Sequence, residues 1–423
     1  MLARESSAGL ESAVKKARIR LIPFLFVLYV VAYLDRINVG FAALQMNAAL
    51  GLSATTYSFG ASVFFLSYTA FEVPSNVILA RVGARLWIAR IMVTWGVVSA
   101  GMMLVRSASS FYVLRFLLGV AEAGFFPGII FCLSRWFPSD ERARAIAAFM
   151  TAVVVAGMVG GPVSGALLTM DGTAGLAGWQ WLFLLEGLPA IALGFVVYRA
   201  LPDTPADARW LTAGERDALE RRLEQEAAAR GEVATVGHAF TSGRVWLLAA
   251  AYFTIPVALY AMGFWLPQMV KATTTGSDFE VGVLSAIPYA VAAVGMVIVG
   301  RHSDRAGERR WHVALSGLVG GAAFAASAFV HGTSMTLATL SLAMLGLASM
   351  LGPFWALSSG FLRGSGAAAG IALINSVGNI GGFVGPNIVG YVGQRTSSIT
   401  AGLTVVGAIL VVGGLLTLTV DDG

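Results

Sequence analysis

Cysteine, histidine and charged side chains are scarce in this sequence of 423 residues. The single cysteine, Cys132, excludes an intramolecular disulfide and a thiolate metal cluster, and the four histidines lack the spacing of metal ligands. Charged residues make up 12% of the chain, about half of their share in a soluble domain. Hydrophobic residues make up 57%, and the mean hydropathy is +0.77. The main solvent of this chain is therefore expected to be lipid rather than water.

Signals for nucleotide chemistry and for nucleic-acid binding are also absent. No Walker-type lysine follows a glycine-rich turn, which excludes transport driven directly by nucleotide hydrolysis. No basic stripe with interleaved aromatic residues accompanies the net charge of +5, so nucleic acid is not an expected partner. Neither a cofactor nor a metal ion is expected.

Twelve segments are long and apolar enough to cross a bilayer, for which a helix needs about 20 residues. They cover residues 21–44, 55–80, 86–106, 109–134, 145–170, 181–201, 245–270, 281–300, 311–331, 335–361, 367–391 and 398–419. The first is longer than a signal-peptide core and contains charges, so we expect it to remain as an uncleaved helix. The sequence therefore predicts an all-α polytopic membrane protein with twelve transmembrane helices.

Arginine is unevenly distributed between the two sides of this predicted bundle. With twelve spans both termini share one side, and the loops on that side contain eleven arginines, against three basic residues in the other loops. The first set is Arg81, Arg85, Arg90, Arg135, Arg142, Arg144, Arg301, Arg305, Arg309, Arg310 and Arg363, and the second is Arg106, Lys271 and Arg395. Because cytoplasmic loops are enriched in basic residues, both termini are expected to be cytoplasmic.

Two short elements recur at the same offset and indicate an internal repeat. Pro162, which follows two glycines, and Pro386, which follows one, are 224 residues apart. Arg81 and Arg305, which each begin an Arg-x-Gly-x-Arg element, are separated by the same 224 residues. Equal offsets at independent places predict two pseudo-symmetric six-helix halves.

The predicted halves are residues 1–201 and 244–423, joined by a cytoplasmic linker at 202–243. The linker is the one extended polar stretch of the chain. Thr212 and Glu215 have the spacing of a capping box ahead of a charged run, which predicts an amphipathic helix from Ala213 to about Ala229. We expect this helix to be solvated.

Asp35 and Arg36 interrupt the first apolar segment near its middle. At 1.5 Å per residue Asp35 lies roughly 21 Å from the start of the helix, near the midplane of a hydrocarbon layer about 30 Å thick. Charged groups at this depth are expensive and are interpreted as functional by default. Glu122 in the fourth segment lies at a similar depth, and Arg115 precedes it by two turns on the same face. A carboxylate that alternately gains and loses an arginine neighbour can take up and release protons, whereas a static ion-pair network is the structural alternative.

One face of the first helix carries Tyr29, Tyr33, Arg36 and Gly40, at intervals of four, three and four residues. The planar guanidinium binds a carboxylate through two parallel hydrogen bonds and keeps its charge, so this face is predicted to bind a carboxylate. The alternatives are that Arg36 only pairs internally with Asp35 or Glu122, and that Tyr29 only packs helices. Asn375 and Asn379 share a face of the eleventh segment, where an amide pair could orient oxygens of a ligand or join helices.

The loop between the eighth and ninth segments resembles the cytoplasmic loop signature of the major facilitator superfamily. It reads Gly300-Arg-His-Ser-Asp304-Arg305-Ala-Gly307-Glu-Arg309-Arg310, and the degraded copy after the second segment reads Arg81-Val-Gly83-Ala-Arg85. In that copy Ala80 occupies the position of the aspartate. The arginines either only set topology, or Asp304 and Arg305 also join helix ends and bias an equilibrium between two conformations.

A narrower resemblance, to the anion:cation symporter branch of that superfamily, covers nearly the whole chain. It rests on Tyr33-Leu-Asp35-Arg36-Ile-Asn38-Val-Gly40, Phe71-Glu72-Val-Pro74-Ser-Asn76, Arg115-Phe-Leu-Leu-Gly119-Val-Ala-Glu122-Ala-Gly124-Phe-Phe-Pro127, Arg135-Trp136-Phe137-Pro138 and Trp181-Leu-Phe-Leu-Leu-Glu186-Gly187. Within this branch the sequence is similar to bacterial permeases for tartrate, phthalate, hydroxyphenylacetate and sugar acids.

The resemblance implies a role for three of these residues: Asp35 and Glu122 carry protons, and Arg36 meets the substrate anion. Tyr68 matches a tyrosine that approaches substrate in the family, although packing is an equal alternative. Glu72 and Glu186 match family motifs but lie nearer helix ends, so we interpret both as structural.

The expected function is proton-coupled import of a small organic anion by alternating access, performed by a monomer in the bacterial cytoplasmic membrane. Exchange or efflux is the alternative within transport. A polytopic membrane enzyme is a further alternative, but the clustered catalytic residues that it requires are not apparent.

Overall fold

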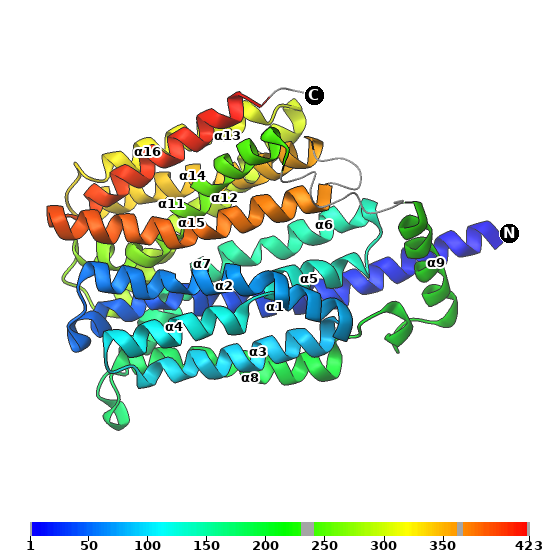
Figure 1. Ribbon diagram of the computed structural model, residues 1–423, viewed down its shortest axis with the longest axis horizontal. Helices are drawn as coiled ribbons and strands as arrows, with labels where there is room; N and C mark the ends of the chain where they lie inside the picture. Colours follow the sequence, from blue (N-terminus) through cyan, green and yellow to red (C-terminus); the bar gives the residue numbers. More distant parts are fainter. Residues whose placement is uncertain (1, 230–240, 362–366, 421–423) are drawn as a thin grey trace.

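The computed structural model describes residues 2–229, 241–361 and 367–420, and within them the chain is helical without a strand (Figure 1). The helices are α1 (Leu2–Leu50), α2 (Ala54–Val82), α3 (Ala84–Gly101), α4 (Ala108–Glu122), α5 (Phe125–Ser134), α6 (Ser139–Met150), α7 (Ala152–Leu168), α8 (Gly178–Ala200), α9 (Ala213–Ala229), α11 (Gly243–Lys271), α12 (Asp278–Ala306), α13 (Arg310–Ala326), α14 (Thr333–Phe361), α15 (Ala367–Thr396) and α16 (Ile399–Leu418). Short 3-10 turns occur at η1 (Met102–Leu104), η2 (Thr173–Gly175) and η3 (Pro205–Asp207).

Ten segments of the described residues are long and apolar enough to cross a membrane, with α4–α5 and α6–α7 each contributing to one segment. The other two predicted spans are α13, which has 17 residues, and α15, which carries three asparagines. Both run along the same bundle as the ten, where α13 packs on α14 and α16 and α15 packs on α2 and α11 (Figure 1). The predicted all-α polytopic fold is confirmed.

The break between α4 and α5 follows directly after Glu122. Gly124 has a φ of +88°, a left-handed conformation that favours glycine, and a Cβ at this position would lie 2.3 Å from the Ser75 hydroxyl. That hydroxyl donates to the carbonyl oxygen of Ala123 at 2.6 Å. Ser75 on α2 therefore satisfies the backbone at the point where the helix ends.

The helices before and after the linker meet where glycines let backbones approach. A Cβ at Gly40 on α1 would lie 2.8 Å from the carbonyl oxygen of Gly263 on α11. A Cβ at Gly161 on α7 would lie 2.2 Å from the carbonyl oxygen of Gly282 on α12. Small residues at such crossings are typical of membrane helices, in which close van der Waals packing replaces the hydrophobic effect.

Polar contacts close one end of the interface between the two sets of helices. Gln45 donates to Asp278 at 2.8 Å, and the Thr55 hydroxyl donates to Gln394 at 2.6 Å. Gln45 and Thr55 lie at the ends of α1 and α2, and Asp278 and Gln394 at the ends of α12 and α15, that are away from the arginine-rich loops. The described part of the chain is therefore closed on the side opposite those loops.

The linker helix α9 packs against the N-terminal part of α1 (Figure 1). The predicted capping box is confirmed, because Thr212 N donates to Glu215 at 2.9 Å and Glu215 N donates to the Thr212 hydroxyl at 3.3 Å. The expectation that α9 is solvated was wrong for one of its faces, since Leu219 is fully buried and Glu215 binds Lys16 of α1 at 2.7 Å. Hydrogen bonds from Lys16, Ser12 and the Thr212 backbone lower the pKa of Glu215 to about 2.

Candidate functional site

Arg36 lies at the centre of the bundle and is only 7% exposed. Its Nη2 forms an ion pair with Glu122, the last residue of α4, and its Nη1 donates to the hydroxyl of Tyr260 on α11 at 3.1 Å. The guanidinium also lies over the rings of Phe64 and Tyr68 on α2, 5.4 and 5.3 Å from their centroids. The geometry is that of a buried charge pair with aromatic walls, to which α1, α2, α4 and α11 contribute.

Asp35 is not the partner of Arg36, although the two residues are adjacent. Adjacent residues on a helix point about 100° apart, so Asp35 faces α3 instead. It accepts hydrogen bonds from Trp95 Nε1 at 2.8 Å and from the Ser99 hydroxyl at 2.9 Å, and it is 1% exposed. Asn38, one turn further along α1, donates a third hydrogen bond at 3.3 Å. The carboxyl of Asp35 is thus held by neutral donors only.

Arg115 is fully buried and shares a face of α4 with Glu122, as predicted. Its Nη2 donates to the carbonyl oxygen of Ala61 at 2.5 Å, whereas Nε and Nη1 have no hydrogen-bond partner among the residues that the structure describes. Glu122 interacts with Arg115 electrostatically but forms its ion pair with Arg36. The predicted charge network is thus one ion pair with a second guanidinium close by.

The predicted tyrosines are all buried but differ in their surroundings. Tyr68 lies against Arg36, whereas Tyr29 stacks on Phe149 with a centroid distance of 4.6 Å. Tyr33 packs against Ile37 and Ala156. The packing alternative therefore describes the contacts of Tyr29, and Gly40 lies at the crossing of α1 and α11. The ligand roles of all three tyrosines stay predictions.

Asn379 on α15 donates to Glu72 on α2 at 3.3 Å and so connects helices on the two sides of the linker. Glu72 is 4% exposed, and Asn375, one turn earlier on α15, is half-buried. The sequence pattern indicated neither this contact of Glu72 nor the place of Tyr260 at the site. A tyrosine in an apolar helix gives no signal by itself, but Tyr260 is 224 residues after Arg36, which is the offset of the repeat.

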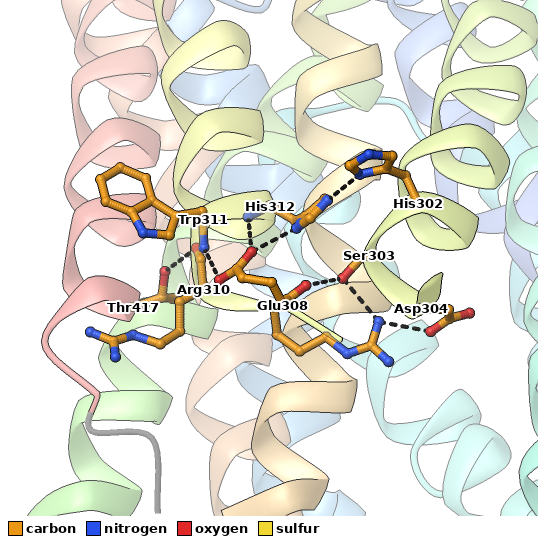
Figure 2. A network of polar contacts seen from close by, with 9 residues as sticks. His302, Ser303, Asp304, Glu308, Arg310, Trp311, His312 and Thr417 are labelled. Carbon is orange, nitrogen blue, oxygen red and sulfur yellow. Dashed lines mark hydrogen bonds and ion pairs between the residues drawn. The ribbon is translucent and has the colours of Figure 1, made fainter. Parts of the chain in front are cut away.

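The loop after α12 is held by its own ion pairs (Figure 2). Asp304 binds Arg309 at 2.7 Å, and Gly307, with a φ of +67°, turns the chain. Despite partial burial, which acts in the opposite direction, hydrogen bonds from Trp311 N and from His312 hold the pKa of Glu308 below its usual range. The loop is thus a compact turn that caps the start of α13.

Asp304 near the end of α12 forms its ion pair with Arg309, which precedes α13, whereas Arg305 is exposed. The copy after α2 receives its carboxylate from elsewhere in the chain. Asp203 accepts from the backbone of Arg85 at 2.8 Å and lies beside Gly83, whose φ is +92°. Arg81 in this copy is exposed. A gating role for either loop stays a prediction.

The sequence and the fold of this chain are similar to those of known membrane proteins. The sequence model of the Major Facilitator Superfamily matches residues 25–386. A putative tartrate transporter of Agrobacterium vitis is 49% identical over 408 residues, which cover 96% of this chain and 90% of the relative. A quinolone resistance transporter of Acinetobacter baumannii is 41% identical over 409 residues, which cover 96% of this chain and 94% of the relative.

Among solved structures, a bacterial homologue of the human lysosomal transporter Spinster, in an inward-facing and occupied conformation, has a TM-score of 0.78. The match covers 95% of this chain and 96% of that chain at 16% identity. At this identity the likeness concerns the fold alone.

Proposed function

The chain belongs to the Major Facilitator Superfamily and is a multi-pass membrane transporter rather than an enzyme, and we propose that it imports a small organic anion together with protons. The substrate class is a carboxylate such as tartrate, an aromatic acid or a sugar acid. The names of relatives support this class, since the Agrobacterium vitis protein is a putative tartrate transporter.

The buried pair of Arg36 and Glu122 is the observation that carries the proposal. A substrate carboxylate can replace Glu122 on the guanidinium, because the two groups have the same chemistry. Glu122 would then be left as a buried charge without its partner, which is strongly destabilising. Uptake of a proton by Glu122 removes that cost. Binding of the anion and binding of a proton are therefore linked at one arginine.

The hydrogen bond from Arg36 to Tyr260 supports alternating access. Arg36 belongs to the first set of helices and Tyr260 to the second, so a ligand at this guanidinium touches both. In the conformation described, contacts such as Gln45 with Asp278 close the far end of the interface. Opening that end requires these contacts to separate while the two sets of helices remain in contact at the ligand.

The arginine-rich loops support an orientation of the protein in the membrane. We propose that these loops and both termini are cytoplasmic, that the protein resides in the bacterial inner membrane and that it works as a monomer.

The experiment is uptake of labelled tartrate into proteoliposomes with an inward proton gradient. Accumulation that a protonophore abolishes is expected, and Glu122→Gln should bind tartrate but concentrate it much less than the parent protein does. Accumulation that persists without the gradient would contradict proton coupling.

Efflux is the second candidate, because a relative 41% identical to the chain is a quinolone resistance transporter. The same vesicles decide between the two candidates. A gradient that expels a fluoroquinolone, while tartrate does not move, would favour efflux.

A further inference from the structure

Glu186 on α8 is a buried carboxyl outside the site of Arg36. It is 6% exposed, and its Oε1 accepts a hydrogen bond from the Ser164 hydroxyl on α7 at 2.8 Å. Its Oε2 has no hydrogen-bond partner, and among the described residues no basic side chain lies within ion-pair distance of it. An ionised carboxylate in this position would lack any compensating charge.

The surroundings of Glu186 are apolar. It lies on the wall of a cavity of about 230 Å³ between α1, α7 and α8. The other lining residues are Val31, Leu34, Val163, Leu167, Leu185 and Pro189. Because an ionised carboxylate is costly beside such side chains, the group holds a proton unless a donor or a cation stabilises the charge.

Asn38 on α1 connects Glu186 to Asp35. Its amide donates to Asp35 at 3.3 Å, and its side chain lies close enough to Glu186 to interact with that carboxyl. Within the described part of the chain the Oδ1 of Asn38 has no donor, just as the Oε2 of Glu186 has no partner. Two buried acceptors on neighbouring groups are satisfied by one proton, which turns the carboxyl of Glu186 into a donor for the amide oxygen.

Among the described residues no basic group forms an ion pair with either carboxyl, although Arg115 on α4 interacts electrostatically with Asp35. The two carboxyls of the pair face each other, Asp35 from α1 and Glu186 from α8. Glu122 at the end of α4 acts on Asp35 as a further negative group. The neighbouring α3 contributes the neutral donors Trp95 and Ser99, and α7 contributes Ser164. Arg36, on the same helix as Asp35, is occupied by Glu122.

We propose that Asp35 and Glu186 form a carboxyl pair bridged by Asn38, which holds one proton in the described conformation. An amide has one donor side and one acceptor side, so it matches one ionised and one protonated carboxyl. Rotation of the amide by 180° would match the opposite assignment. Glu186, interpreted from the sequence as structural, thereby becomes a proton-binding residue.

That this proton takes part in transport rests on the proposed function, whereas its presence on the pair does not. The two statements are therefore tested separately, the first by vesicle uptake and the second by infrared spectroscopy of the purified protein.

Infrared spectroscopy detects a protonated carboxyl by a C=O band that is absent from carboxylates. At neutral pH the parent protein should show such a band, and Glu186→Gln should lose it. Glu224→Gln, which removes an exposed glutamate of α9, should retain it. Ser164→Ala keeps the carboxyl but removes a hydrogen bond, so the band should persist at a shifted frequency. A band unchanged in Glu186→Gln would overturn the proposal, and a band unmoved by Ser164→Ala would overturn it even if Glu186→Gln did not fold.

The transport arm measures tartrate accumulation at a gradient of one pH unit. Each coupled proton multiplies accumulation by roughly ten at this gradient, so Glu186→Gln should lower the plateau about ten-fold while tartrate exchange without a gradient is retained. An unchanged plateau would remove the proton of Glu186 from the cycle. If the parent protein failed to accumulate tartrate, the proposed function would fail, and the infrared result would still decide whether the pair holds a proton.

Discussion

The six helical spans before the linker bury six charged side chains, whereas the described residues of the six spans after it bury none. The buried charges are Asp35, Arg36, Glu72, Arg115, Glu122 and Glu186. At the repeat offset of 224, the four carboxyl residues correspond to Leu259, Met296, Gly346 and Leu410. Two sets of helices with the same architecture have therefore specialised, one for charge and one for neutral contacts.

The difference bears on how the two sets of helices can separate. The second set offers Tyr260 to Arg36 and Asn379 to Glu72, which are neutral hydrogen-bonding groups. Because no buried ion pair spans the interface in the described residues, separating the two sets breaks hydrogen bonds but exposes no unpaired charge.

Removing the ion pair of Arg36 and Glu122, which lies in the helices before the linker (the charged half), should have the largest effect on stability. Arg36→Leu leaves Glu122 buried without its partner, which should lower the free energy of unfolding by about 3 to 5 kcal/mol. The double variant Arg36→Leu with Glu122→Leu should recover most of this loss but should not transport. Thermal unfolding in detergent measures both, and a single variant as stable as the parent would show that the pair is not an energetic unit.

A subtler change at the same residue tests carboxylate recognition. Arg36→Lys keeps the charge but loses the two-pronged contact, so tartrate binding should weaken by about 1.5 to 3 kcal/mol, a factor of roughly ten to more than a hundred. Calorimetry with tartrate and with its diamide separates this from general damage. Equal losses for both ligands would mean that Arg36 is not the partner of the carboxylate.

A substitution in the helices after the linker (the neutral half) should have a weaker effect on tartrate binding. Tyr260→Phe removes one hydrogen bond to Arg36 and should weaken tartrate binding by about 1 kcal/mol, while proton-driven accumulation continues. Tyr391→Phe, at an exposed position of α15, is the matched control. Loss of proton coupling in Tyr260→Phe would place coupling chemistry in the second half and contradict the comparison.

The smallest effect concerns the linker, which is docked on the charged half. Glu215 has a pKa of about 2 in the folded protein against an ordinary 4.5, so its contribution is complete above pH 4.5 and is lost as the pH falls towards 2. Limited proteolysis by pepsin should therefore cut α9 faster as the pH falls through this range. Glu215→Gln should already release α9 at neutral pH in a trypsin digest, whereas Glu224→Gln should not.

The sequence allowed a site residue to be predicted wherever a charged side chain stands in an apolar segment. Asp35, Arg36 and Glu122 are visible as charges in apolar runs, and the spacing of Thr212 and Glu215 predicted the start of α9. The choice of partner could not be predicted, because it depends on how each helix is rotated about its axis. Arg36 had two carboxylates as possible partners, and only the packing of α4 against α2 and α3 brings Glu122 to it.

Residues that match their surroundings gave no such signal. Tyr260 is an ordinary aromatic residue of an apolar helix, and the docked face of α9 is small, consisting mainly of Ala218 and Leu219 around Glu215. The pairing of Glu186 with Asn38 depends on α1 and α8 lying side by side, which neither segment reveals on its own.

The crossing of α1 and α11 has a mechanical consequence. Arg36 meets Tyr260 and Gly40 meets Phe264, so each residue contacts its own counterpart in the repeat. Self-matching contacts occur only where the axis relating two copies passes, and a rigid body that turns about a pivot moves least at that pivot. If the two bundles tilt about this point, a ligand bound to Arg36 would stay almost stationary while the two ends of the interface open and close in turn. The pivot and the binding site would then coincide. The protein would move the permeability barrier from one side of the ligand to the other, rather than move the ligand across the membrane.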